Sequence, residues 1–357
     1  MNILIIRVSS IGDVIHTLPA IFLLKACVPQ ARITWIVQEK AASLIVNQPF
    51  LDRVVVIPNR FFMPGAFAKT AGLVNELRAT RWDAIIDFQG LIKTSLLLFS
   101  LRGKKYGFDW KNARESVSSL LTHQHTAPVY KNIIQKNLAL VSDVIYDLVG
   151  PTSCPTIDTL QKSFYIQTPT DKKNVVDSWL QKNSLTNVIA LCPNTTWESK
   201  RWPSEHWNEL AKKLANTMPE RQLVLMGKDF GADAKAVAEY AAQHRLPVHI
   251  LPSWDLATTT YFLQKVSLLI APDTSFLHLA DFLGVPAIGL FGPTSKLRHG
   301  PFLFTPNIAR AIQVPCPHVY QKSHGTENCM QQLSAADLAQ AIHRLPFSCQ
   351  KNAPSVS

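Results

Sequence analysis

Short apolar stretches typical of buried strands alternate with stretches of helical periodicity along most of this chain of 357 residues. Such alternation is typical of α/β proteins with parallel sheets, in which a helix connects each strand to the next. The alternation stops in a polar segment bearing Pro and Thr, residues 150–170, and then begins again. A chain of this length is also too long for a single ordinary core. We therefore expect an α/β protein with two Rossmann-like domains.

The expected elements divide the chain into an N-terminal domain over residues 1–160, a C-terminal domain over residues 161–330, and a final helix and tail over residues 331–357. In the first domain the pattern predicts strands at residues 2–8, 33–37, 53–57 and 83–87, and helices at residues 14–26 and 66–79. In the second it predicts strands at residues 187–191, 221–227, 247–251, 267–271 and 286–290, and helices at residues 204–216, 232–244, 276–282 and 335–344.

The chain is basic, with 36 Lys and Arg against 25 Asp and Glu, and residues 1–150 carry the larger share of the excess. A basic surface suits nucleic acid, an anionic membrane or a polyanionic substrate, although it can also be merely solvated. None of the sequence patterns of nucleic-acid-binding domains is present, so we expect no nucleic-acid partner. Arg7 interrupts the first apolar run, and no run approaches the ~20 residues that a membrane helix needs. We therefore expect a cytoplasmic protein.

Six cysteines are spread along the chain without close pairing, which is the usage expected of reduced thiols in a reducing compartment. They are Cys27, Cys154, Cys192, Cys316, Cys329 and Cys349. A zinc site built from two of them with His318 is an alternative, but well-separated cysteines are more often structural. The chain contains no GxGxxG, Walker or HExxH sequence, which argues against nicotinamide, flavin or metal chemistry.

The first expected strand runs directly into a turn of small residues that ends on a carboxylate, Ser9-Ser10-Ile11-Gly12-Asp13. In an open parallel sheet, ligands bind beyond the carboxyl ends of the strands, so Asp13 is expected at a ligand site. Ser10 and Gly12 would let backbone N–H groups approach a polar ligand. The simpler alternative is that Asp13 only caps the first helix, which Asp does well.

A second strand end of this kind lies in the C-terminal domain, where Asp273, Thr274 and Ser275 stand at the start of a helix. Side-chain oxygens and free N–H groups at such a position bind anions. His278 follows one turn later, on the face that a diphosphate could reach. The alternative is an ordinary helix cap followed by a buried core histidine.

A third cluster follows the strand at residues 187–191, where Thr195 and Thr196 precede two adjacent cations, Lys200 and Arg201. The hydroxyls could donate hydrogen bonds to a phosphate, and Lys200 could neutralise its charge. A solvated loop with a surface cation pair is the alternative.

Four segments, taken together and in this order, resemble the ADP-heptose:lipopolysaccharide heptosyltransferases, glycosyltransferase family nine: residues 9–14, 87–93, 200–203 and 273–278. Residues 107–110 and 113–115 and the Thr195-Thr196 pair look most like the heptosyltransferase I branch, which adds the first heptose to the Kdo residue on lipid A. The resemblance implies a GT-B fold, with two Rossmann-like domains facing across a cleft, inverting chemistry, and no metal or other cofactor.

The resemblance also implies a role for each candidate residue. Asp13 is the expected base. The residues expected to bind ADP-heptose are Thr195, Thr196, Lys200, Trp254, Asp273, Thr274, Ser275 and His278. Those expected to bind the Kdo-lipid A acceptor are Ser10, Gly12, Arg60, Gln89, Lys93 and Arg114, with Lys104 and Lys105 as further candidates. Such an acceptor implies a peripheral position on the cytoplasmic face of the inner membrane.

Some positions depart from the family pattern. Ser275 stands where the family usually has Gly, and the acidic residue that grips heptose hydroxyls has no clean match, because Asp229 and Asp233 are near but offset. The segments around Cys316 and Cys329 are similar to other branches, including heptosyltransferase II. Two alternatives therefore remain: a heptosyltransferase II or related sugar transferase, and a basic binding protein without catalysis. Trp254 could likewise anchor a surface helix instead of contacting adenine.

Overall fold

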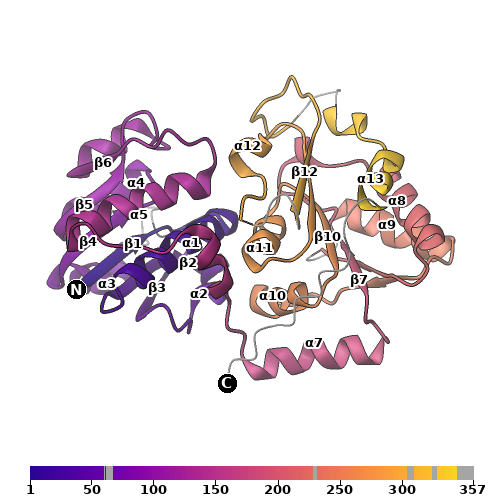
Figure 1. Cartoon of the computed structure of the whole chain (residues 1–357), viewed down its shortest axis with the longest axis horizontal. Helices are drawn as coiled ribbons and strands as arrows, with labels where there is room; N and C mark the ends of the chain where they lie inside the picture. The colour runs from indigo at the N-terminus through magenta and orange to yellow at the C-terminus, as the bar shows by residue number, and fades with distance from the viewer. Residues whose placement is uncertain (60, 62–66, 228–230, 304–308, 324–327, 344–357) are drawn as a thin grey trace. The chain divides into compact units, whose positions relative to one another are not determined.

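The computed structural model describes residues 1–59, 61, 67–227, 231–303, 309–323 and 328–343 (Figure 1). The chain separates into two compact units, Met1–Gln167 and Thr168–Ser357. This division lies seven residues beyond the boundary expected at residue 160. The final helix is not a separate part, because it packs against a helix of the second unit.

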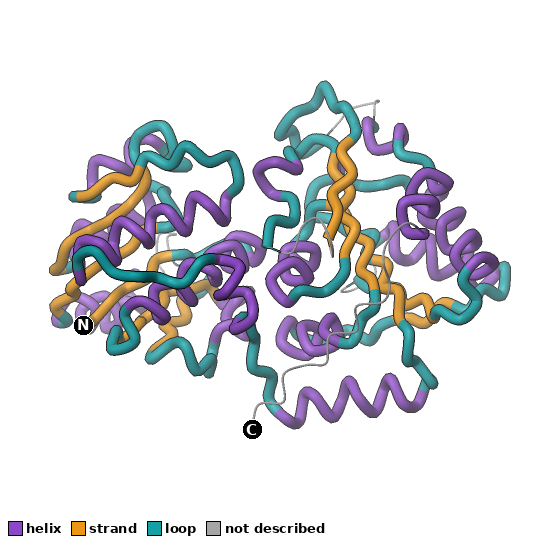
Figure 2. The backbone as a smooth tube through the Cα atoms, in the orientation of Figure 1, coloured by secondary structure: helices purple, strands orange, loops and turns teal. Residues whose placement is uncertain are grey.

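The first unit is built on a six-stranded sheet in which every paired strand is parallel, in the order β3-β2-β1-β4-β5-β6. The strands are β1 (Asn2–Ile6), β2 (Arg32–Gln38), β3 (Arg53–Ile57), β4 (Arg81–Asp87), β5 (Arg102–Phe108) and β6 (Gln124–Thr126). The helices are α1 (Ile11–Cys27), α2 (Glu39–Ile45), α3 (Phe67–Ala79), α4 (Ile92–Ser100), α5 (Ile133–Val149) and α6 (Ile157–Leu160), with 3-10 turns η1 (Ser116–Leu121) and η2 (Gln161–Ser163). Figure 2 shows these helices flanking the strands.

The second unit repeats this plan with parallel strands in the order β12-β11-β10-β7-β8-β9. The strands are β7 (Val188–Leu191), β8 (Gln222–Leu225), β9 (Val248–Ile250), β10 (Leu268–Pro272), β11 (Ala287–Phe291) and β12 (Ala309–Gln313). The helices are α7 (Thr170–Lys182), α8 (Ser204–Thr217), α9 (Ala232–Gln243), α10 (Leu256–Gln264), α11 (Ser275–Leu283), α12 (Lys296–His299) and α13 (Ala335–His343), with 3-10 turns η3 (Glu198–Lys200) and η4 (Cys329–Gln332).

The central strand of each sheet has neighbours on both sides and helices above and below, which explains its unbroken apolar sequence. Ile3, Leu4, Ile5 and Ile6 of β1 are fully buried between β2 and β4. In the second unit, β10 lies between β11 and β7 and is buried along its whole length. The predicted α/β class is thus confirmed, and the loops that follow β1 and β10 lie at the carboxyl ends of their sheets.

Most expected strands and helices are present within a few residues of their expected bounds. The prediction omitted the strands β5, β6 and β12 and the helices α2, α4, α5, α6, α7, α10 and α12. β5 begins Arg-Gly-Lys-Lys and so lacks an apolar run, because it lies nearer the sheet edge and tolerates polar side chains.

The cysteine prediction was wrong for four of the six residues. The fold brings Cys27 at the end of α1 to Cys154, with Cα atoms 5.4 Å apart, and Cys316 to Cys329, with Cα atoms 5.3 Å apart. Both pairs form disulfides, and Cys192 is free and buried. Spacing along the chain concealed these pairs, because the first joins residues 127 positions apart.

None of the helices in the described residues combines the length and apolar character needed to cross a membrane. Among the same residues, no group of three or more His, Cys, Asp or Glu side chains is placed to hold a metal ion.

Candidate active site

The carboxylate of Asp13 lies at the start of α1, in the loop that leaves the carboxyl end of β1. Asp13 Oδ2 accepts hydrogen bonds from the backbone N of Ser10 at 3.0 Å and from Ser10 Oγ at 3.2 Å. Ser10 is the N-cap residue and Asp13 the third helical residue, so the pair forms a capping box. The capping alternative therefore holds as a structural role, but it uses only one of the two carboxylate oxygens.

Two arginines face the Asp13 carboxylate. The buried Arg7 places Nη2 3.6 Å from Oδ1, and Arg114, whose side chain is 61% exposed, places Nη1 3.9 Å from Oδ2. Burial alone would raise the pKa of Asp13, but the charges of Arg7 and Arg114 and the hydrogen bonds from Ser10 together lower it. Asp13 is therefore ionised throughout the neutral pH range.

The corner after β4 lies beside this carboxylate, because β4 pairs with β1 in the sheet. Gln89 Oε1 accepts hydrogen bonds from the backbone N of Val8 at 2.9 Å and of Ser9 at 3.2 Å, which ties the two strand ends together. Gly90 adopts a φ of +60°, and a Cβ there would lie 3.2 Å from Arg114 N. The fold thus brings Ser10, Asp13, Gln89 and Arg114 to one edge of the sheet.

Asp87, at the end of β4, is a buried carboxyl that the sequence analysis did not single out. Its Oδ1 accepts hydrogen bonds from the backbone N of Gln89 and of Gly90, at 2.9 and 3.2 Å. Burial nevertheless raises the pKa of Asp87 to about 6. Arg7 lies in the electrostatic field of both Asp87 and Asp13, and it donates a hydrogen bond to the carbonyl of Phe88. Arg7 could have been recognised from the sequence as a site residue, because it is a charged residue directly after the apolar run of β1.

For the other proposed acceptor residues, no contact with the cluster around Asp13 is found among the described residues. Lys93 is exposed on α4, and Arg60 lies outside the described residues. Lys104 pairs with Asp147 of α5, while Lys105 is buried in β5 with Nζ 3.4 Å from the carbonyl of Gly103. Lys104 and Lys105 lie three to four residues before the carboxyl end of β5, whereas Asp13 lies beyond the carboxyl end of β1.

In the second unit, Asp273 follows β10 and both of its carboxylate oxygens are engaged. Oδ2 lies 2.7 Å from Lys200 Nζ, and Oδ1 lies 3.1 Å from His278 Nε2. All three side chains are largely buried. Burial alone would raise the pKa of Asp273, but the hydrogen bond and charge of His278 and the charge of Lys200 hold it far below its usual range. The predicted cluster at the start of α11 is present, and Lys200 is already ion-paired within it.

The hydroxyl groups near this cluster differ in whether they already form a hydrogen bond within the protein. Thr195 Oγ1 donates to the carbonyl of Trp197, whereas the side chain of Thr196 is exposed. Thr274 is the N-cap of α11 but makes no side-chain cap bond, and its buried Oγ1 has no partner among the described residues. Ser275 opens the helix and is partly buried. The N-terminus of α11 therefore retains unused donors, as an anion site requires.

Arg201 points to a different partner from its neighbour Lys200. Its Nε lies 3.4 Å from Asp233 Oδ2, and its side chain is substantially exposed. Burial raises the pKa of Asp233, although the charge of Arg201 opposes this shift. Asp229, the other acidic residue considered, lies outside the described residues.

Trp254 is partly buried against its own unit. Its ring contacts Trp179 of α7 edge-on, with centroids 5.5 Å apart, and lies 6.1 Å from the ring of Phe262. This packing is the kind expected of a residue that anchors a helix, and it leaves part of the ring accessible.

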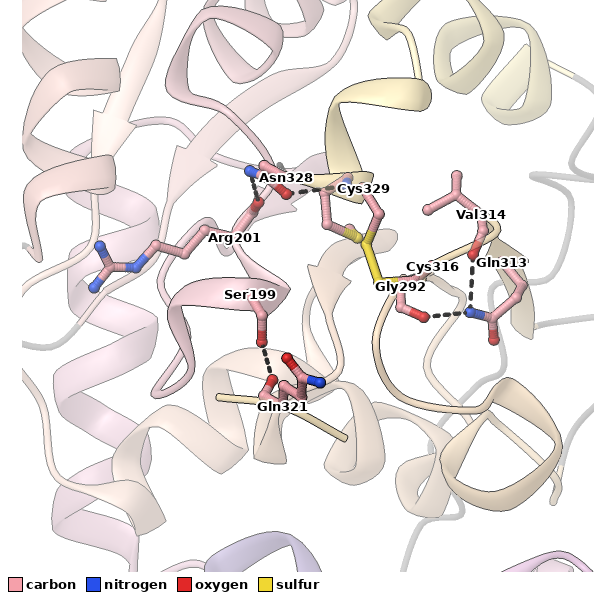
Figure 3. Close-up of a disulfide and its surroundings, with 10 residues drawn as sticks. Ser199, Arg201, Gly292, Gln313, Val314, Cys316, Gln321, Asn328 and Cys329 are labelled. Atoms are coloured by element: carbon pink, nitrogen blue, oxygen red, sulfur yellow. Dashed lines mark hydrogen bonds between the residues drawn. A yellow bond between two sulfur atoms is a disulfide. The ribbon is translucent and has the colours of Figure 1, made fainter. Parts of the chain in front are cut away.

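The backbone on both sides of Lys200 is held by the segment between Cys316 and Cys329 (Figure 3). Ser199 Oγ donates to the carbonyl of Gln321 at 2.5 Å, and Asn328 Nδ2 donates to the carbonyl of Arg201 at 3.1 Å. Sequence reasoning gave no signal for these contacts, because they join residues more than 120 positions apart.

The chain was compared with protein families, characterised proteins and solved structures. Residues 70–330 match the family described as glycosyltransferase family 9 (heptosyltransferase). The chain is 28% identical over 301 residues to lipopolysaccharide heptosyltransferase 1 of Escherichia coli strain K12, a match that covers 82% of this chain and 88% of the relative. It is 26% identical over 338 residues to lipopolysaccharide heptosyltransferase 2 of Salmonella typhimurium strain LT2, covering 88% and 87%.

Among solved structures, E. coli heptosyltransferase WaaC with ADP matches with a TM-score of 0.75 and 25% sequence identity, covering 96% of this chain and 99% of that chain. The match includes both units, so the predicted GT-B fold class is confirmed. The family match covers most of the chain and includes the turn of Lys200 and the start of α11. On this evidence the chain is a glycosyltransferase that belongs to glycosyltransferase family 9.

Proposed function

We propose that this protein transfers L-glycero-D-manno-heptose from ADP-heptose to the Kdo region of the lipopolysaccharide inner core. The proposal draws on similarity along most of the chain to relatives named lipopolysaccharide heptosyltransferase, at 28% identity for one numbered 1 and 26% for one numbered 2. The observation that carries the chemistry is an ionised, partly exposed carboxylate, Asp13, at the carboxyl end of β1.

The reaction is an inverting displacement at the anomeric carbon of the donor. The acceptor hydroxyl oxygen forms the new bond to this carbon while the bond to the β-phosphate oxygen breaks, and ADP leaves with the electron pair. Asp13 accepts the hydroxyl proton. A carboxylate of lowered pKa is a weak base, so it takes the proton late, when the attacking oxygen already carries positive charge.

Departure of ADP places negative charge on the β-phosphate, and the second unit supplies groups that can stabilise it. Lys200, the N-terminus of α11, and the hydroxyls of Thr274 and Thr196 lie beyond the carboxyl ends of β7 and β10, and a helix N-terminus beside a lysine suits a diphosphate. Lys200 keeps its contact with Asp273 and offers another of its three N–H donors to the phosphate. Because a lysine and a helix terminus provide the positive charge, we propose that the reaction needs no metal ion.

The acceptor side of the site is basic. Arg114 approaches Asp13 while remaining mostly exposed, so it is available to a carboxylate or phosphate of the acceptor. Gln89 has a buried Nε2 with no partner among the described residues, which a small local shift would offer to a polar group. Both residues belong to the cluster around Asp13.

A lipid-linked acceptor also calls for contact with a membrane surface. The adjacent elements α4 and η1 carry unusually exposed apolar side chains, with Phe99 76% and Leu120 71% exposed. Lys93 on α4 is exposed as well. Apolar side chains beside basic ones suit the surface of an anionic bilayer, so we propose a peripheral position on the cytoplasmic face of the inner membrane.

The decisive experiment incubates the protein with ADP-heptose and Kdo-lipid A in excess chelator and measures ADP release and the mass of the product. Transfer of one heptose supports the proposal. Activity only on an acceptor that already bears a heptose would assign the protein to the second transfer step instead. No transfer to either acceptor, or transfer that requires added magnesium, would contradict the proposed substrate or the metal-free mechanism respectively.

The two adjacent cations offer an internal control for the phosphate site. Lys200→Ala is expected to weaken donor binding and to slow transfer together, because leaving-group charge grows in the transition state. Arg201→Ala should have the smaller effect, since Arg201 pairs with Asp233. A larger defect in the Arg201 variant would contradict the assignment of Lys200.

A further inference from the structure

The Cys316–Cys329 disulfide lies next to the turn that carries Lys200, and nothing in the mechanism above uses it (Figure 3). Cys316 follows β12, and Cys329 opens η4. A Cβ added at Gly292, in the loop after β11, would lie 2.9 Å from Cys329 Sγ. The disulfide is therefore packed against the carboxyl end of the same sheet that positions Asp273.

The chain between the two cysteines holds the Lys200 turn from both sides. Before Lys200, the backbone N of Ser199 donates to the carbonyl of Lys322 at 3.2 Å, and Ser199 Oγ donates to the carbonyl of Gln321. After Lys200, the carbonyl of Arg201 accepts from Asn328 Nδ2. The described residues of the segment thus hold the backbone on either side of Lys200 and make no hydrogen bond to its ammonium group, which lies 2.7 Å from Asp273 Oδ2 and 4.5 Å from the centroid of the Trp197 ring.

The described residues of this segment, 317–323 and 328, make few other hydrogen bonds to the rest of the second unit. Tyr320 N donates to the carbonyl of Pro293, and Asn328 Oδ1 accepts from the backbone N of Met330. The residues from 317 to 323 contain neither helix nor strand, and most of their side chains are exposed. A surface segment with this little support has a low cost of local opening, so the covalent bond between its ends restricts it strongly.

We propose that the Cys316–Cys329 disulfide, acting through Ser199 and Asn328, positions Lys200 for the donor diphosphate, so that the thiol–disulfide state of this pair sets the affinity for ADP. Ser199 and Asn328 are positioning residues, because they act through the backbone of Lys200. This inference rests on the proposed function, which assigns Lys200 to the diphosphate.

The chemical step is an ordinary thiol–disulfide exchange with a dithiol reductant. One thiolate of the dithiol attacks a sulfur of the Cys316–Cys329 bond, which forms a mixed disulfide and releases the other cysteine as a thiolate. The second thiolate of the dithiol then attacks the dithiol sulfur of the mixed disulfide and releases the remaining cysteine. Two electrons and two protons pass from the dithiol to the two cysteine sulfurs, and the dithiol becomes a disulfide. The segment then loses its covalent closure while its hydrogen bonds to Ser199 and Arg201 remain, so Lys200 becomes less well positioned without being removed.

The first test measures the Kd for ADP by calorimetry and the KM values for donor and acceptor, before and after treatment of the full-length protein with a dithiol. Alkylation followed by mass spectrometry reports the state of the cysteines. We expect reduction to raise the Kd for ADP and the donor KM about tenfold. This effect is smaller than the ~100-fold loss of rate that a displacement of about 1 Å can cause at a reacting group. The acceptor KM should not change, and reoxidation should restore the donor values.

Variants separate this bond from general effects of reduction. The double variant Cys316→Ser/Cys329→Ser should reproduce the weakened ADP binding and no longer respond to dithiol. The matched control is Cys27→Ser/Cys154→Ser, which removes the disulfide of the first unit, far along the chain from Lys200, and should leave ADP affinity and its response to dithiol unchanged. If the double variant fails to fold, Asn328→Asp tests the same link, since it replaces the donor to the Arg201 carbonyl with a charged carboxylate oxygen and keeps the acceptor for Met330 N.

Two results would overturn the inference: free thiols at both Cys316 and Cys329 in the protein as isolated, or an ADP affinity that is the same in the oxidised, reduced and serine forms. The proposed function fails separately, through an unchanged Kd and rate in Lys200→Ala. In that case the segment would still be closed by the disulfide, but the residue that it holds would have no part in donor binding.

Discussion

Asp13 and Asp273 lie at strand ends in different units, after β1 of the first and after β10 of the second, and are held in opposite ways. Each follows the central strand of a parallel sheet and stands at the start of a helix, and each has a lowered pKa. The Asp13 side chain is 23% exposed and its arginine contacts are long, at 3.6 and 3.9 Å. The Asp273 side chain is 5% exposed, with close contacts to Lys200 and His278.

The difference indicates that the two carboxylates have different roles. Long contacts, one of them to an exposed arginine, can be exchanged for contacts to a substrate at little cost, because exposed ion pairs contribute little. Close contacts between buried groups cannot be exchanged so readily, because each group left alone would be a desolvated charge. We infer that the first carboxylate takes part in the reaction, whereas the second organises the cation and histidine that meet the donor.

The largest effect is expected from Asp13→Asn. Loss of a general base typically costs about 100- to 10,000-fold in rate, and Asn cannot accept the proton. Because the amide oxygen can still accept the hydrogen bonds from Ser10, the capping box and the fold should persist. Steady-state kinetics, ADP calorimetry and thermal unfolding measure the three properties. A rate close to that of the unmodified protein would mean that Asp13 is only a helix cap.

Asp273→Asn should instead reduce stability as well as donor binding. Breaking a buried ion pair on one side typically costs about 3–5 kcal/mol, because the remaining charge stays desolvated. The double variant Asp273→Asn/Lys200→Met removes that charge and should recover much of the stability while remaining defective in ADP binding. Denaturant unfolding of the two variants tests this. Equal stability of Asp273→Asn and the unmodified protein would contradict the picture of a tightly held pair.

Arg7→Met probes the electrostatic control of Asp13. The Arg7 charge favours the ionised carboxylate, so its removal raises the pKa of Asp13, and a larger fraction is protonated at low pH. The acidic limb of the pH profile of kcat/KM should therefore move to higher pH, and Arg7→Lys should move it less. Asp87, with a pKa of about 6, is the competing source of such a limb. If the limb disappears in Asp87→Asn, it belongs to Asp87, and the assignment to Asp13 is wrong.

Features of the fold and the site that depend on neighbouring residues could be predicted from the sequence, whereas features that depend on contacts between distant residues could not. The strand-end positions of Asp13 and Asp273 follow from local patterns, because an apolar run and a small-residue turn specify a βα corner within about ten residues. The partners of these carboxylates do not follow. Arg114 reaches Asp13 only because β1 and β4 are neighbours and the chain then returns after β5. Lys200 reaches Asp273 by the equivalent pairing of β7 with β10.

The same reasoning applies to the two lysines of β5 and to the cysteines. Lys104 and Lys105 were grouped with the acceptor residues because of their charge, and only the register of β5 against β4 shows that they precede the strand end. The two disulfides depend on where distant segments meet, which spacing along the chain does not reveal. Local chemistry was thus predictable, while pairing across the sheet was not.

The smallest expected effect concerns Trp254, the candidate for contact with adenine. Its packing on Trp179 and Phe262 belongs to the rigid part of the second unit, so it resembles Asp273 more than Asp13 in how it is held. If adenine rests on the accessible part of the ring, ADP should change the intrinsic fluorescence, and Trp254→Phe should remove most of that change. The substitution should weaken ADP binding only a few-fold, because an aromatic pair contributes about 0.5–1.5 kcal/mol. Trp179→Phe is the matched control, since Trp179 shares the packing. An ADP-dependent signal that survives in Trp254→Phe and is lost in Trp179→Phe would leave Trp254 as a helix anchor and place the base elsewhere on this unit.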